Sequence, residues 1–125
     1  MSTMSRGRLL LALLTLVAAA PASSETHGAV HHSVFFELNA APGSPAEQAF
    51  LEQLAALASL PGVEDFEIVR EVSDKNPFRF GATMRFADAA AYQAYNQHPD
   101  HVRFVEQVWV PGVANFQEID WAALP

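Results

Sequence analysis

The chain has 125 residues, no cysteine and a formal net charge of −7 at pH 7. This length corresponds to a single domain of ordinary size. The acidic balance argues against nucleic-acid binding, which depends on clustered lysine and arginine, and the lack of cysteine excludes disulfide bonds. We therefore expect the fold to be held by its hydrophobic core, or by that core together with a partner chain.

The N-terminal segment, residues 1–22, is typical of a secretory signal peptide. Two arginines precede an apolar run over residues 9–20 that contains one threonine. This run is too short to span a bilayer, and the small residues after it fit cleavage behind Ala22. We expect a secreted or periplasmic protein with a flexible leader over residues 23–29 and no stable membrane insertion after cleavage. An uncleaved N-terminal anchor is the alternative.

Residues 30–38 alternate in the way that is typical of a β-strand. One face would carry Val30, His32, Val34, Phe36 and Leu38, and the other His31, Ser33, Phe35 and Glu37. Because Phe35 makes the second face partly apolar, we expect both faces of this strand to be covered.

A helix is expected from Pro45 to about Ala58. Ser44 and Glu47 form a capping box with proline at the first helical position, and such a cap contributes about 1 kcal/mol. The predicted buried stripe comprises Ala46, Phe50, Leu54 and Leu57. The Pro-Gly pair at 61–62 opposes continuation of the helix.

Three strands and two helical segments complete the predicted fold. Strands are expected over residues 63–73, 78–86 and 113–121, the first of them with Phe66, Ile68 and Val72 on one side. Asp88 is expected to cap a short helix to about Tyr95, and a second helical segment begins at Pro99 and ends at Pro111–Gly112.

The resulting order, β-α-β-β-α-β, predicts a ferredoxin-like α+β fold with a four-stranded antiparallel sheet and helices on one face. Such a fold leaves one sheet face uncovered. The simplest cover is the sheet of a second copy, so we expect a homodimer that forms an α/β barrel.

The densest group of polar residues lies at positions 95–104, within an otherwise alanine-rich, apolar region. His101 falls in the first turn of the second helical segment, where a neutral imidazole with an unperturbed pKa of about 6.5 is suited to act as a base. Tyr95, with a pKa of about 10, would donate or relay a proton. His32 would face both residues from the first strand. The three are our candidate catalytic residues, able together to remove a proton beside a carbonyl.

Two other interpretations use the same residues. In the structural one, His98 and His101 cap and pin the break between the two helical segments, Tyr95 packs beneath them, and His32 is a core histidine. In the metal-site one, His32 joins both of these histidines, but Pro99 disturbs their helical spacing, so we expect no metal. The sequence has no glycine-rich phosphate loop and no nucleophile triad pattern, and we expect no cofactor.

Three stretches resemble the stress-responsive α/β-barrel (Dabb) domain family. They are VHHSVFF at 30–36, LPGV at 60–63 and YNQHPDHVRF at 95–104. The resemblance extends to residue 121, with the domain placed at residues 30–122, and implies a ferredoxin-like fold and a dimeric barrel.

A plant polyketide cyclase of this family has an acid/base histidine and tyrosine in the same motif, and these correspond to His101 and Tyr95. Its first-strand pocket histidine corresponds to His32, and a tyrosine of its first helix to Gln53. With the predicted signal peptide and the aromatic residues that would line a pocket, we expect an exported Dabb domain that binds a small apolar or aromatic ligand between sheet and helices. The alternative is a cofactor-independent cyclase, isomerase or lyase that uses the His/Tyr pair.

Overall fold

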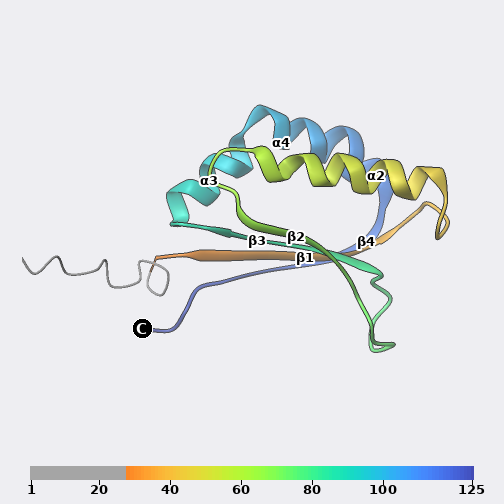
Figure 1. Ribbon diagram of the computed structural model, residues 1–125, viewed down its shortest axis with the longest axis horizontal. Helices are drawn as coiled ribbons and strands as arrows, with labels where there is room; N and C mark the ends of the chain where they lie inside the picture. Colours follow the sequence, from red (N-terminus) through yellow and green to blue (C-terminus); the bar gives the residue numbers. More distant parts are fainter. Residues whose placement is uncertain (1–27) are drawn as a thin grey trace, which may run out of the picture.

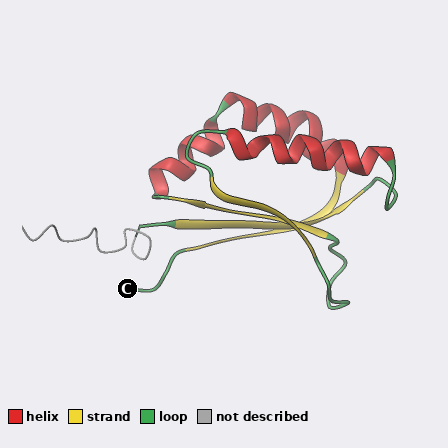
Figure 2. Cartoon of the chain, viewed as in Figure 1, coloured by secondary structure: helices red, strands yellow, loops and turns green. Residues whose placement is uncertain are grey.

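The computed structural model describes residues 28–125, so the predicted signal peptide and most of the leader lie outside the described residues. A four-stranded sheet carries all of its helices on one face (Figures 1 and 2). Its strands are β1 (Val30–Leu38), β2 (Glu64–Arg70), β3 (Phe80–Phe86) and β4 (Val113–Trp121), in the spatial order β2-β3-β1-β4. All neighbours are antiparallel. The predicted ferredoxin-like fold is confirmed.

The central strand β1 sets the register on which the site depends. His32 pairs with Met84 of β3 on one side and with Asp120 of β4 on the other, and Val34 pairs with Glu118. Directly opposed residues of neighbouring strands share a sheet face. Glu118 and Asp120 therefore lie on the same face as His32, beneath the helices.

Helix α2 (Pro45–Ala55) begins at the predicted cap, where the Glu47 amide donates to the Ser44 hydroxyl at 3.2 Å. The last turn of the predicted helix tightens into the 3-10 helix η1 (Ala56–Ser59). The Glu47 carboxylate reaches back one residue further than expected and accepts from the Gly43 amide at 3.1 Å.

The prediction for the buried side of α2 was wrong at one position. Ala46 is exposed, and Glu47 is buried together with Phe50 and Leu54. Glu47 can lie there because its carboxylate is bonded to the preceding loop and lies 3.7 Å from Arg79, which offsets the cost of removing a charge from water.

Strand β2 ends earlier than the sequence pattern indicates. Val72, predicted to lie on its buried side, is 92% exposed, because the chain leaves the sheet after Arg70. An irregularity between Glu64 and Glu67 shifts the register between β2 and β3, and Asp65, which lies within it, has a positive φ of 51°. An irregular edge strand of this kind is common in antiparallel sheets.

The second helical region is broken where the sequence predicts. Helix α3 (Ala89–Gln97) is capped by Asp88, and α4 (Pro99–Phe104) follows after His98, which is extended because a proline comes next. The chain then continues through a π-helical turn, η2 (Val105–Trp109), and the short α5 (Val110–Gly112). A π-helical turn often marks a functional site. No helix within residues 28–125 has the length and apolar character needed to cross a membrane.

The core lies between the sheet and the helices. Phe36 is fully buried, with its ring centroid 5.5 Å from that of Phe50 and 5.2 Å from that of Trp109. No helix of residues 28–125 lies over the opposite face of the sheet (Figure 2). On that face Ile119 and Trp121 remain 52% and 47% exposed, which is a large apolar area to leave in water.

Candidate functional site

A cavity of about 310 Å³ lies between the helix-covered face of the sheet and the last helical region. This volume is in the range of small-molecule sites. Its wall is mainly apolar and includes Leu54, Met84, Phe104 and Trp109. Its polar residues are His32, Tyr95, Asn96, His101 and Glu118. The structure therefore brings the three predicted site residues to one cavity.

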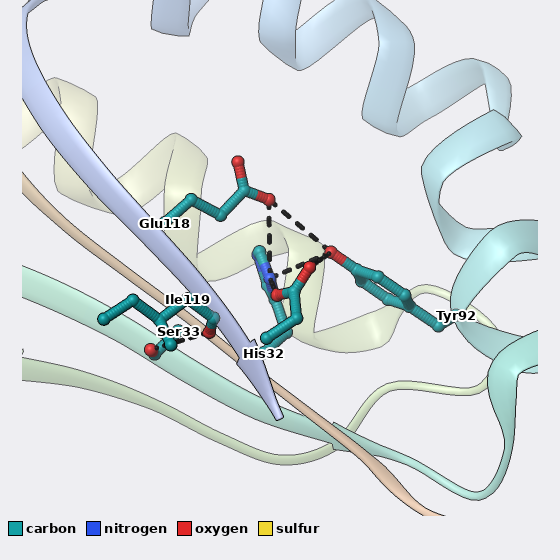
Figure 3. A network of polar contacts seen from close by, with 6 residues as sticks. His32, Ser33, Tyr92, Glu118 and Ile119 are labelled. Carbon is teal, nitrogen blue, oxygen red and sulfur yellow. Dashed lines mark hydrogen bonds and ion pairs between the residues drawn. The ribbon is translucent and has the colours of Figure 1, made fainter. Parts of the chain in front are cut away.

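His32 is 6% exposed and held by a carboxylate and a phenol. Its Nδ1 lies 2.5 Å from Asp120 Oδ1 and 3.0 Å from the Tyr92 hydroxyl, which donates to Asp120 Oδ2 at 2.9 Å (Figure 3). The tautomer that satisfies these contacts carries its proton on Nδ1. Its Nε2 has no hydrogen-bond partner within residues 28–125, which leaves a lone pair for a ligand.

His101 is oriented across the helix break. Its Nδ1 donates to the backbone carbonyl of Asn96 at 3.1 Å, so the unprotonated nitrogen is Nε2. Burial lowers the pKa of His101 below its ordinary 6.5, and the nearby His32 acts in the same direction. The imidazole is therefore neutral near pH 7. This is the direction expected from the sequence, although burial rather than the helix N-terminus is the main cause.

Tyr95 lies between His101 and the core. It is 2% exposed, and its ring centroid is 4.3 Å from that of His101 and 5.0 Å from that of Phe86. Burial, with a smaller effect of Glu118, raises the pKa of Tyr95 above its ordinary 10. The phenol therefore stays protonated and is able to donate a hydrogen bond.

The structural interpretation applies to His98 in particular. Its Nδ1 accepts from the Asp100 amide at 3.1 Å and so caps α4, and His98 does not line the cavity. His101 also bridges the break through Asn96, but it lines the cavity in addition. The two histidines of the motif thus have separable positions, which makes them a matched pair for experiments.

The three-histidine metal set considered from the sequence is not assembled in the described part of the chain. The potential ligands that converge there are Nδ1 of His32 and the carboxylates of Glu118 and Asp120, all within 4.8 Å of one another. Nδ1 of His32 is already engaged by Asp120, and both carboxylates reach solvent. Hydrogen bonding is enough to account for this convergence.

Three residues of this network were not predicted from the sequence: Tyr92, Glu118 and Asp120. One signal was available for Tyr92, because it precedes Tyr95 by three residues and such pairs share a helix face. The two acids join the site only through the pairing of β4 with β1. Gln53, the counterpart of a cyclase tyrosine, is exposed and does not line the cavity.

Comparisons with known proteins place this geometry in a family. The family model of the stress responsive A/B barrel (Dabb) domain matches residues 30–123. A Dabb family protein from Mesorhizobium loti with a ferredoxin-like fold is 45% identical, with a TM-score of 0.77 over 79% of this chain and 100% of that one. A search of curated proteins found no match.

Two more distant structures share the fold. A dimeric ferredoxin-like protein from Jannaschia is 26% identical, with a TM-score of 0.62 over 77% of this chain and 100% of that one. The hydroxynitrile lyase of Passiflora edulis is 11% identical, with a TM-score of 0.67 over 75% of this chain and 92% of that one. The family match over nearly all of the described residues decides the assignment: the chain belongs to the stress responsive A/B barrel (Dabb) domain family.

Proposed function

We propose that this Dabb domain binds a small aromatic molecule in the cavity between sheet and helices. The observation that carries the proposal is the combination of an apolar wall with a polar end, where two imidazole Nε2 atoms have no hydrogen-bond partner among the described residues. A ligand that displaces water from these nitrogens would have to supply their hydrogen-bond partners, which favours a ligand with a polar group at this end. The aromatic side chains of Phe104 and Trp109 suit a planar ligand.

The cavity is accessible from solvent beside the edge strand β4. Val110 and Phe116 line it and are 67% and 49% exposed. Val110 begins α5 and Phe116 lies in the first half of β4, so the opening lies between the last helical turn and β4 at the edge of the sheet. A ligand could enter there without any separation of the sheet from α2.

A neutral fluorescent probe, N-phenyl-1-naphthylamine, tests the binding proposal. We expect saturable binding to the wild type, and a loss of at least about tenfold in affinity in Val105→Phe, which places extra volume in the cavity. Val102→Phe is the matched control, because Val102 of α4 is 39% exposed and does not line the cavity. This variant should bind the probe like the wild type. Absence of binding to the wild type, or equal binding by both variants, would contradict the proposal.

A cofactor-independent lyase, isomerase or cyclase activity is a second candidate. It is favoured by the fixed tautomer of His101, which directs an unprotonated nitrogen away from Asn96 while the protonated phenol of Tyr95 lies beside it. In this candidate His101 is the base, Tyr95 stabilises the developing oxyanion, and His32 orients the substrate. The hydroxynitrile lyase shares only the fold with this chain.

We also propose that the protein is a homodimer whose uncovered sheet faces pack together. The apolar side chains of Phe35, Ile119 and Trp121 lie on that face, with the Phe35 ring packed closely over Gly81. Two solved neighbours are described as dimeric ferredoxin-like proteins. A second sheet would remove the exposed apolar area from water.

The export signal remains a proposal from the sequence alone. Cleavage behind Ala22 predicts a secreted or periplasmic protein whose first residue is Ser23. Intact mass spectrometry of the protein expressed with its full N-terminus in a bacterial host measures this directly. A chain that retains residues 1–22 in the membrane fraction would show an uncleaved anchor instead.

A further inference from the structure

Glu118 gives the polar end of the cavity a negative charge. Its side chain lines the cavity from β4 and is 47% exposed. Its polar contacts among the described residues are with His32 Nδ1 at 3.6 Å and the Tyr92 hydroxyl at 3.5 Å. Asp120 adds a second carboxylate next to His32. Even with His32 protonated, two carboxylates would face one imidazolium.

No lysine or arginine of residues 28–125 lines this cavity. The arginines are engaged elsewhere: Arg79 lies near Glu47, Arg85 pairs with Glu64, Arg103 pairs with Asp100, and Arg70 lies over the ring of Phe80. The negative charge at the polar end is therefore not neutralised by a cationic side chain. An anionic ligand would meet repulsion there that is only partly screened by solvent.

The hydrogen-bonding groups at the polar end include three acceptors: Nε2 of His32, Nε2 of His101 and the Glu118 carboxylate. The Tyr95 hydroxyl and the Asn96 amide are able to donate. A ligand group that donates would satisfy several of these acceptors. A carboxylate brings only acceptors, so it would leave both imidazole nitrogens and the Glu118 carboxylate unpaired while losing its own water.

We propose that Glu118 is a specificity-determining residue: the cavity accepts aromatic molecules whose polar group donates hydrogen bonds and carries no negative charge, and excludes aromatic carboxylates. The inference rests on the proposed ligand-binding function and names its substrate class. Aromatic alcohols, phenols and amines belong to that class. Products or substrates that carry a free carboxylate at the polar end do not.

Three naphthalenes of matched size test the proposal by displacement of N-phenyl-1-naphthylamine: 1-naphthylmethanol, 1-naphthylmethylamine and 1-naphthoate. We expect the alcohol and the amine to displace the probe from the wild type at concentrations at least about tenfold below the acid. In Glu118→Gln the acid should displace the probe at a lower concentration than in the wild type. The difference in displacing concentration between acid and alcohol, called the gap below, should therefore close. Glu106→Gln removes the same charge from an exposed position outside the cavity and should leave the gap unchanged.

The outcomes separate the two proposals. Failure of the probe to bind the wild type would overturn the ligand site and this inference together. Binding of the probe with equal displacement by acid and alcohol would overturn only the charge selectivity. An unchanged gap in Glu118→Gln, with a melting temperature close to that of the wild type, would remove Glu118 from the role, because the folded variant would still exclude the acid.

Discussion

Replacing His101 with alanine is expected to slow proton exchange at the carbon beside the carbonyl of an aryl ketone by about 10²–10⁴-fold, if the domain is a catalyst. In the proposed mechanism, His101 Nε2 takes the proton, the electron pair moves to the carbonyl oxygen, and the Tyr95 hydroxyl donates to the enolate. Return of a deuteron from heavy water completes the exchange. A suitable aryl ketone is α-hydroxyacetophenone, whose hydroxyl group also donates a hydrogen bond. Proton NMR in heavy water follows the loss of its methylene signal beside the carbonyl.

The control for this experiment is His98→Ala. His98 caps α4 but does not line the cavity, so this variant should lose about 1 kcal/mol of stability and keep its exchange rate. Equal loss of the exchange rate in both variants would show that the two histidines affect exchange by holding the break between α3 and α4, and that His101 is not the base. A wild-type rate no higher than that of buffer would leave ligand binding as the function.

The pH profile of the exchange rate gives a further readout of His101. The base must be neutral, so activity is present above the pKa of His101 and falls as pH drops through it. Because burial lowers that pKa below 6.5, the acidic limb of the profile should have its midpoint below 6.5. A midpoint above 6.5 would assign the base to another group.

The elements of this fold could be predicted because their signals are local. The alternation in β1 and the capping box at Ser44 each depend on a few neighbouring residues. The predictions were wrong where contacts with residues distant in the sequence determine whether a side chain is buried. The burial of Glu47 depends on its contacts with the preceding loop and with Arg79, and the exposure of Val72 depends on where the chain leaves the sheet.

The site was predicted only in part for the same reason. His32, Tyr95 and His101 were identified from a dense motif and from the alternation of one strand. Asp120, which holds the proton of His32 on Nδ1, lies 88 positions further along the chain. Its place follows from the register between β1 and β4, and no spacing within either strand specifies that register.

Replacing Ile119 with aspartate is expected to dissociate the proposed homodimer. Ile119 pairs with Ser33 on the uncovered sheet face and is 52% exposed. A second sheet packed there would bury the new carboxylate, and the arginine of that face, Arg85, already pairs with Glu64. An uncompensated buried charge costs about 3–5 kcal/mol, which raises the dissociation constant by about 10²–10³-fold or more. Sedimentation velocity at micromolar concentration should show a dimer for the wild type and a monomer for the variant.

Leu124→Asp provides the matched control, because Leu124 lies beyond β4 and is 91% exposed. It introduces the same charge and should remain dimeric. The Ile119 variant should still fold, since its side chain contributes little to the protomer core and Ser33 donates to the backbone oxygen of Ile119 rather than to its side chain. Because side chains alternate along a strand, the substitution leaves Glu118 and Asp120 on the cavity side. A wild-type monomer, or dissociation by both substitutions, would refute packing through this face and would leave the cavity proposal intact.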